Sequence, residues 1–264
     1  MNVTQKVIWI TGASSGIGAA LAIELSKREC KLILSARKQD KLMETKEACS
    51  GNPDDIAILP VDVGITDELT QKTEAAEQIF GPIDILVNNA GISQRSLCVD
   101  TQLEVYARLM NINYLGTVGL TKALLPQMIA RGSGQIVVVS SLTGKFGTPL
   151  RTGYSASKHA LHGFFDSLRT EVHQHGIEVL LICPGFIRTN ISINAVVGDG
   201  SNQGKMDEAQ AKGMDPYHCA RKMISAMEAG KEEVNIGGNE TFGVLIKRFF
   251  PTLFSRIIRS TKVT

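Results

Sequence analysis

The sequence predicts an α/β protein in which one doubly wound parallel sheet of seven strands is flanked by helices and followed by a helical tail. Two observations carry this prediction. Short apolar runs alternate with longer amphipathic stretches as far as residue 185, and the runs are continuously apolar. Continuous apolar runs are typical of strands buried on both faces. Because parallel strands need crossover connections, usually helices, the alternation favours a single doubly wound sheet.

Each expected strand is one of these apolar runs. In chain order they are VIWIT (7–11), KLILSA (31–36), IAILPVDV (56–63), IDILVNN (83–89), QIVVVSS (135–141), IEVLLIC (177–183) and EEVNIG (232–237). The expected helices lie between the runs and repeat apolar residues at intervals of three and four. They cover 16–30, 66–81, 103–131 and 154–175. Thr66 is a candidate N-cap, and Gly132 and Gly176 follow the last two helices.

The whole chain, residues 1–264, is expected to form one domain. It is 43% hydrophobic and 20% charged, which suits an ordinary buried core and excludes general disorder. No linker, repeat or low-complexity segment interrupts the alternation. The apolar runs are shorter than a membrane-spanning helix needs, and the first residues lack the pattern of a secretory signal. We therefore expect a cytoplasmic protein.

The cysteines and histidines predict neither a disulfide framework nor a metal site. The five cysteines are scattered and never form a C-x-x-C pair, which indicates a reducing compartment. The close histidine pairs, His159 with His162 and His173 with His175, lack a third ligand nearby in the sequence.

Residues 186–215 break the alternation with a polar, glycine-bearing segment of weak periodicity. In a doubly wound sheet such an insertion lies outside the carboxyl ends of the strands, where ligands bind. A disordered surface loop is the alternative. We interpret the segment as a substrate lid, because long loops in compact domains are usually functional.

A glycine-rich turn joins the first strand to the first helix, which is typical of a dinucleotide site in a Rossmann fold. Its sequence, Thr11 to Gly18, follows the spacing G-x-x-x-G-x-G through Gly12, Gly16 and Gly18. Glycines let the backbone approach a pyrophosphate, and the helix that follows offers free N–H groups and the positive end of its dipole. A purely structural glycine turn is the alternative reading.

The end of the second strand predicts NADP(H) rather than NAD(H). An NAD-binding strand usually ends in an acid that receives the ribose 2′-hydroxyl. No carboxylate occurs from Lys31 through Gln39, and Arg37 stands there instead. A guanidinium can clamp a 2′-phosphate. Asp40 could favour NAD(H), although it lies past the turn.

The pattern Tyr154-x-x-x-Lys158 opens a predicted helix and predicts proton-transfer chemistry. Residues four apart share a helical face. An ammonium near a phenol lowers the tyrosine pKa from about 10, which makes the group usable as an acid or base. Ser141, thirteen residues upstream, could hydrogen-bond a substrate carbonyl, and the amide of Asn113 could hold a water.

Taken together, these motifs resemble the short-chain dehydrogenase/reductase family over residues 5–240. The resemblance implies that Tyr154 is the general acid/base, that Lys158 binds the nicotinamide ribose and lowers the tyrosine pKa, that Ser141 positions the carbonyl, and that Asn113 holds a relay water. The choice of Ser141 over Ser140 rests on family spacing. The implied cofactor-binding residues are Gly12, Ser14, Ser15, Gly16, Ile17, Gly18, Arg37, Asp62, Val63, Asn89, Ala90, Gly91, Tyr154, Lys158, Pro184, Gly185, Ile187 and Thr189. Many NADP-dependent relatives carry a basic residue where this chain has Ser15.

The segments 91–101, 113–126 and 153–165 resemble the dehydrogenase/reductase member 7 branch, which lies near the hydroxysteroid and retinoid reductases. We therefore expect an NADP(H)-dependent oxidoreductase that interconverts a carbonyl and an alcohol on a small, lipophilic substrate. Two alternatives stay open, a 3-oxoacyl reductase of fatty-acid synthesis and a catalytically silent dinucleotide sensor. A homodimer or homotetramer is implied by the family.

The net charge of +2 hides an uneven distribution. Residues 241–264 carry five basic and no acidic residues, whereas the other 240 residues carry 23 basic and 26 acidic ones. A near-neutral body makes general nucleic-acid binding unexpected. Apolar residues recur in the tail at helical spacing, and Pro251 could begin a second helix. The tail is expected either to pack on the body or to lie on an anionic membrane surface.

Overall fold

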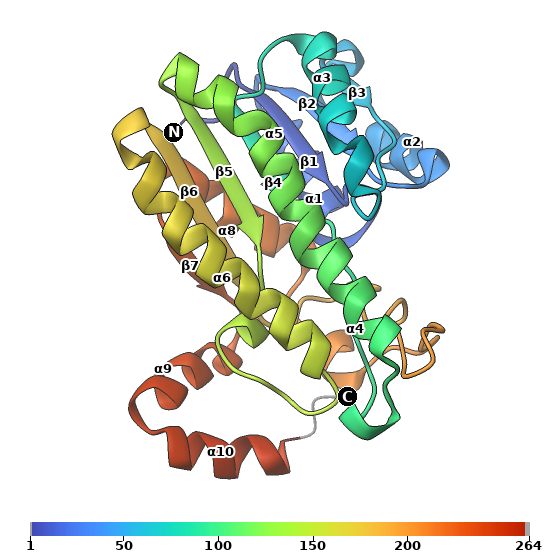
Figure 1. Ribbon diagram of the computed structural model, residues 1–264. Helices are drawn as coiled ribbons and strands as arrows, with labels where there is room; N and C mark the ends of the chain where they lie inside the picture. The colour runs from blue at the N-terminus through green and yellow to red at the C-terminus, as the bar shows by residue number, and fades with distance from the viewer. Residues whose placement is uncertain (1, 262–264) are drawn as a thin grey trace.

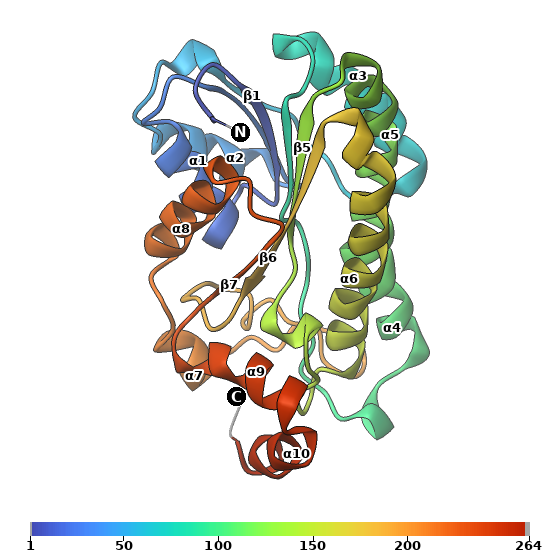
Figure 2. The same ribbon diagram turned by 90° about the vertical axis from the view of Figure 1, so that its left-hand side faces the viewer.

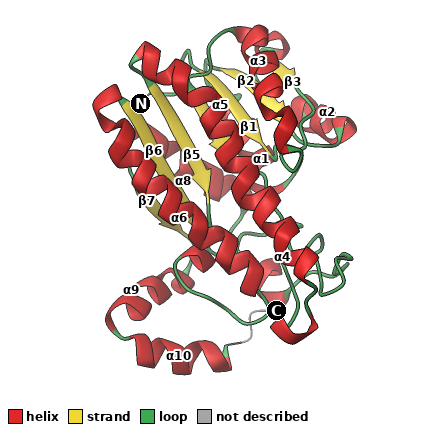
Figure 3. Ribbon diagram, viewed as in Figure 1, coloured by secondary structure: helices red, strands yellow, loops and turns green. Residues whose placement is uncertain are grey.

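The computed structural model describes residues 2–261 and contains one parallel sheet with the strand order β3-β2-β1-β4-β5-β6-β7. The strands are β1 (Val7–Thr11), β2 (Lys31–Ser35), β3 (Ile56–Ile58), β4 (Ile85–Asn88), β5 (Gly134–Val139), β6 (Ile177–Pro184) and β7 (Glu233–Ile236). Figure 3 shows them as one continuous layer between helices. The predicted fold class is therefore confirmed. The order reverses between β1 and β4, and such a switch point leaves a crevice at the carboxyl ends of the strands.

Helices cover both faces of the sheet. They are α1 (Gly16–Leu25), α2 (Gln39–Glu47), α3 (Leu69–Phe80), α4 (Leu103–Met110), α5 (Gly116–Arg131), α6 (Thr152–Val172), α7 (Glu208–Ala211), α8 (Pro216–Glu228), α9 (Phe242–Phe249) and α10 (Pro251–Ser260). Figure 2 shows α1, α2 and α8 on one face of the sheet and α3, α5 and α6 on the other. Successive strand residues serve opposite cores: Ile8 and Ile10 pack with α1 and α8, whereas Trp9 packs with α5 and α6.

Three helices, α2, α7 and α8, were not among the expected elements. Only Leu42 and Thr45 of α2 are buried, so its apolar pattern is too sparse to indicate a helix. Helix α8 follows the long loop directly and begins at Pro216, where Asp215 accepts hydrogen bonds from the first-turn amides.

Three expected boundaries also differ from the structure. Thr66 is not the N-cap of α3, because residues 66–68 form a 3₁₀ turn and Glu68 precedes the helix. The segment 103–131 is not one regular helix, because a π-helical turn at Asn111–Leu115 separates α4 from α5. The third strand stops at Ile58, whereas the apolar run continues to Val63 as a loop toward the crevice.

The C-terminal tail forms a helical hairpin, α9 and α10, with Pro251 in the first turn of the second helix as expected. Figure 1 shows the hairpin in red beyond the carboxyl ends of the strands. Its inner side packs on the body through Phe254, whose ring centroid lies 4.9 Å from that of Phe146. Lys262 and the end of the predicted tail lie outside the described residues. Within residues 2–261, no helix combines the length and apolar composition that crossing a bilayer requires.

Candidate active site

A cavity of about 920 Å³ opens at the carboxyl ends of the strands. Its volume lies toward the upper end of the range for ligand pockets. Most of the residues singled out in the sequence line it. They are Gly12, Ser14, Ser15, Gly16, Ile17, Arg37, Asp62, Val63, Asn89, Ala90, Gly91, Ser141, Tyr154, Lys158, Pro184, Gly185, Ile187 and Thr189. Gly18 and Asn113 do not line it.

The glycine turn after β1 forms one wall of the cavity. Gly12 has a φ of +65°, and a Cβ added there would lie 2.8 Å from Asn89 Nδ2 and 2.9 Å from Ala90 Cα. Asn89 holds this turn by donating to the carbonyl oxygens of Thr11 and Gly12 at 3.0 and 3.2 Å. The first turn of α1 receives no side-chain cap from Ser15, so its N–H groups remain available to an anion.

Gly18 does not line the cavity, although the resemblance implied that it contacts the cofactor. A Cβ on this residue would lie 2.3 Å from the carbonyl oxygen of Gly12. Gly18 therefore lets α1 approach the turn closely, and the cavity wall is made by its neighbours Gly16 and Ile17. The turn as a whole fits a pyrophosphate, because close backbone and uncapped amides face the same space.

Basic side chains gather where β2 ends. Arg37, Lys38 and Lys41 line the cavity, whereas Asp40 is not among its lining residues. Arg37 is exposed. A phosphate group at this end of the cavity would therefore meet cationic side chains.

Tyr154 and Lys158 lie one turn apart on α6 and are both buried. Lys158 Nζ donates to the carbonyl oxygen of Val139 at 2.8 Å and lies 5.9 Å from the centroid of the Tyr154 ring. Burial lowers the pKa of Lys158 to about 8, because the charged ammonium loses solvation. The side chain is therefore still largely charged at neutral pH.

Burial raises the pKa of Tyr154. The sequence had led us to expect the opposite direction, a pKa lowered by the Lys158 ammonium. The groups that oppose this rise are the Ser141 hydroxyl, through a hydrogen bond, and the guanidinium groups of Arg95 and Arg151. Desolvation outweighs them because the phenol is enclosed. In this structure the phenol consequently keeps its proton at neutral pH.

Ser140 and Ser141 follow the end of β5 and have different hydrogen-bond partners. The Ser140 hydroxyl lies 3.0 Å from His162 Nε2 and is buried against α6. The Ser141 hydroxyl accepts hydrogen bonds from the Thr143 amide and hydroxyl at 3.2 and 3.0 Å. Ser141 is also the serine whose hydroxyl lowers the pKa of Tyr154, whereas Ser140 is not among the groups that act on this pKa.

Asn113 lies in the π-helical turn and is fully buried. Its Nδ2 donates to the Ile92 carbonyl oxygen and to Ser157 Oγ, and its Oδ1 accepts from the Ile92 amide at 2.8 Å. Both amide hydrogens are thus committed to the protein. The expectation that this residue holds a water stays a prediction. The side chain fixes the loop behind Gly91, where an added Cβ would lie 3.0 Å from Asn113 Oδ1.

Gln94 holds the start of α6 and was not singled out in the sequence. Its Oε1 accepts hydrogen bonds from the amides of Gly153 and Tyr154 at 2.7 and 3.2 Å. Gln94 therefore caps α6 from another loop, because Arg151 at the N-cap position provides no side-chain cap.

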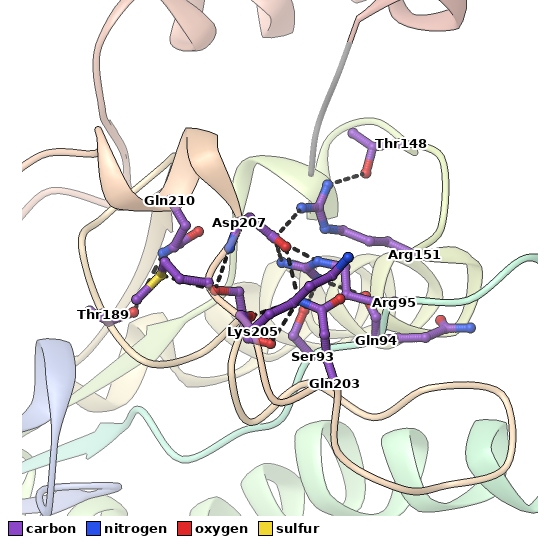
Figure 4. A network of polar contacts seen from close by, with 12 residues as sticks. Ser93, Gln94, Arg95, Thr148, Arg151, Thr189, Gln203, Lys205, Asp207 and Gln210 are labelled. Carbon is purple, nitrogen blue, oxygen red and sulfur yellow. Dashed lines mark hydrogen bonds and ion pairs between the residues drawn. The ribbon is translucent and has the colours of Figure 1, made fainter.

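A buried ionic network lies beside Gln94 and was missed as well (Figure 4). Asp207 Oδ2 accepts from Arg95 Nε at 2.7 Å and from Arg151 Nη2 at 3.4 Å, and Asp207 Oδ1 accepts from Gln203 at 3.0 Å. The side chains of Arg95, Arg151 and Asp207 are all at most 5% exposed. The network joins the loop after β4, the start of α6 and the segment 186–215, so it fixes that segment over the cavity.

Comparison with known proteins agrees with this geometry. The family model for short chain dehydrogenase matches residues 6–198. The human protein named Dehydrogenase/reductase SDR family member 7 is 47% identical over 238 residues, which cover 88% of this chain and 70% of that protein.

Two solved structures share the fold. A short chain dehydrogenase/reductase from Burkholderia phymatum in complex with NAD has a TM-score of 0.83 at 21% identity and covers 96% of each chain. A short chain dehydrogenase from Burkholderia cenocepacia in complex with NADP has a TM-score of 0.80 at 23% identity, over 99% of this chain and 100% of that one. Because both cofactors occur on this fold, the choice between them must come from individual side chains.

Proposed function

This chain belongs to the short-chain dehydrogenase/reductase family, and from that premise we propose that it is an NADP(H)-dependent enzyme for a small lipophilic carbonyl or alcohol. Membership makes it an oxidoreductase that acts on carbonyl or alcohol groups with a nicotinamide cofactor. The cofactor preference, the kind of substrate and the roles of individual residues are the further steps proposed here.

The observation that carries the proposal is the place of Tyr154 and Ser141 in the cavity. On one side of them lies the cradle formed by the glycine turn and Asn89. On the other side the cavity is lined by apolar side chains. These side chains, here called the vestibule, are Phe146, Phe242, Ile246, Phe254, Ile257 and Ile258. A proton donor between a dinucleotide cradle and an apolar vestibule supports reduction of an apolar carbonyl compound.

Residues of the chain itself carry out the proton transfer. When bound, the nicotinamide cofactor supplies or accepts the hydride. Ser141 holds the substrate oxygen by a hydrogen bond, and the Tyr154 phenol gives its proton to that oxygen as negative charge develops there. The raised pKa of Tyr154 suits the donor role. The Lys158 ammonium then stabilises the phenolate that remains, because both groups lie in the same low-dielectric space.

Arg37 supports NADP(H) over NAD(H). The guanidinium stands at the end of β2, where an acid would bind the ribose 2′-hydroxyl of NAD. Lys38 and Lys41 add positive charge to the same part of the wall. A 2′-phosphate fits this end of the cavity by charge, and a guanidinium can hold it through two hydrogen bonds.

NADPH oxidation against a panel of ketones, aldehydes, steroids, quinones and 3-oxoacyl thioesters tests the proposed function. We expect turnover with apolar carbonyl compounds, and a loss of about 10³-fold in Tyr154→Phe. NADPH affinity should change less than about threefold, because the phenol hydroxyl lies outside the phosphate cradle. Tyr114→Phe is the matched control, since this tyrosine does not line the cavity. Full activity of Tyr154→Phe would reject the mechanism, and preference for the thioesters would assign the alternative substrate class.

A further inference from the structure

The outward side of the C-terminal hairpin concentrates exposed apolar side chains. Within residues 2–261, thirteen large hydrophobic residues are exposed, and six of them lie in the hairpin, five on α9 and α10 and one, Phe250, between the two helices. These six, here called the outer row, are Phe242, Leu245, Phe249, Phe250, Leu253 and Ile257. They recur at intervals of three and four along each helix, so each helix presents them on one side. A patch of this kind on a soluble domain usually marks an interaction site.

The opposite side of the hairpin is fixed to the body of the protein. Phe254 is 6% exposed and packs with Leu142, Phe146 and Cys183, and Ile246 and Ile258 pack against this cluster. The outer row therefore cannot turn inward without breaking these contacts. Figures 1 and 2 both show α10 at the extremity of the molecule, clear of the sheet and its covering helices.

Basic side chains flank the outer row. Lys247, Arg248, Arg256 and Arg259 are all exposed, and no acidic residue occurs from residue 241 to the end of the chain. An anionic partner would match this charge, because each lysine or arginine near an anionic lipid surface adds to the attraction. An amphipathic helix with basic residues beside its apolar face is typical of the bilayer interface.

We propose that the outer row docks on the surface of an anionic lipid bilayer, with the four basic side chains facing the headgroups. A second copy of the chain fits this surface less well. In a two-fold contact the same patch meets itself, so the basic clusters of two copies would face each other with no carboxylate from residues 241–264 between them. The bilayer matches both the apolar area and the charge.

The docked surface lies at the mouth of the cavity. Phe242 and Ile257 belong to the outer row and also line the cavity. An apolar substrate could thus pass from the lipid into the vestibule with little exposure to water, a consequence that rests on the proposed function. Docking itself rests only on the surface of the hairpin and does not require catalysis.

Vesicle flotation tests the docking with the full chain. The probes are vesicles of phosphatidylcholine alone and of phosphatidylcholine mixed with phosphatidylserine. We expect binding to the mixed vesicles that weakens as salt is added. The triple variant Leu245→Gln/Phe249→Gln/Leu253→Gln should bind them at least about tenfold more weakly, because it removes apolar area from the interface. None of these three residues lines the cavity.

Two further variants separate the contributions of apolar area and of positive charge to vesicle binding. Replacing Ile65, Val99 and Leu103 with glutamine removes the same number of exposed apolar side chains elsewhere and should leave vesicle binding unchanged. Replacing Lys247, Arg248, Arg256 and Arg259 with glutamine should abolish the preference for phosphatidylserine. Thermal unfolding and NADPH binding check that each variant is folded.

Three results would overturn the docking proposal. The first is the absence of wild-type binding to the mixed vesicles, and the second is equal binding by the triple variant and the wild type. The third is a wild-type dimer, measured by light scattering, that the triple variant converts to a monomer without any vesicle binding. If vesicle binding follows the expected pattern but no carbonyl compound is reduced, only the proposed function fails.

Discussion

The two ends of the cavity are built by different means. At the end where we propose that the cofactor binds, here called the cofactor end, the glycine turn after β1 leaves no room for a Cβ at Gly12, and Asn89 holds it through main-chain carbonyl groups. Arg37, next to the end of β2, adds a side chain to this wall. At the end where we propose that the substrate binds, here called the substrate end, side chains come from distant segments. Arg95 and Asp207, which fix the segment 186–215, are 112 residues apart in sequence. Short sequence motifs therefore specify the structure of the cofactor end. The structure of the substrate end depends on contacts between residues far apart in the sequence.

Asp207→Asn is expected to have the largest effect, lowering stability and substrate turnover while leaving cofactor binding little changed. Removing one charge from a buried pair typically costs about 3–5 kcal/mol, because the remaining charge stays desolvated. We expect a loss of about 3 kcal/mol in the free energy of unfolding, measured by urea denaturation. The kcat/KM for a carbonyl substrate should also fall, since the segment 186–215 loses its anchor over the cavity. NADPH affinity should change little, because Asp207 does not line the cavity.

Glu208→Gln is the matched control for this prediction. Glu208 is the next residue in the same loop, and its ion pair with Lys212 at 3.9 Å is exposed. An exposed pair contributes between 0 and about 1 kcal/mol, so the control should unfold close to the wild type. Equal stability of Asp207→Asn and Glu208→Gln would show that the network does not anchor the substrate end.

A smaller effect, on the pH dependence of stability, is expected from His162, which contacts Ser140. Burial, with the nearby Lys145 ammonium, lowers the pKa of His162 to about 4 from its ordinary 6.5. Between these values the unfolded chain binds more protons at this histidine, so stability rises with pH across that window. We expect His162→Gln to remove about 1–2 kcal/mol of this dependence, a value reduced for screening and for the opposing Glu233 charge.

Urea denaturation from pH 4 to pH 7 measures the dependence. His173→Gln is the control, because His173 is exposed. An acid limb of the stability profile that is the same in His162→Gln and the wild type would show that the buried histidine is not its source.

The sheet could be predicted because its strands are buried on both faces and their runs are continuously apolar. The same reasoning missed α2, in which only Leu42 and Thr45 are buried, because tertiary packing rather than apolar periodicity places it. It also missed α8, although Asp215 followed by Pro216 is a recognisable start signal.

The residues of the candidate site also fall into a group that the sequence could place and a group that it could not. Residues at strand ends, such as Arg37 and Ser141, could be placed because parallel strands bring their carboxyl ends together. Gln94 and Asp207 could not, because neither the residue type nor the spacing indicates which backbone amide or guanidinium each will meet. The sequence also did not indicate that the π-helical turn directs the Asn113 amide onto the Ile92 backbone.

The central claim, that the cofactor end selects the nucleotide independently of the substrate end, is tested most directly in Arg37→Asp. The measurement is kcat/KM for NADPH and for NADH with one carbonyl substrate, in the variant and in the wild type. We predict that the ratio shifts toward NADH by about 100-fold, because the 2′-phosphate loses a charged clamp and meets a carboxylate. The order of preference among carbonyl substrates should stay the same. An unchanged nucleotide ratio, or a changed order of substrates, would contradict the account.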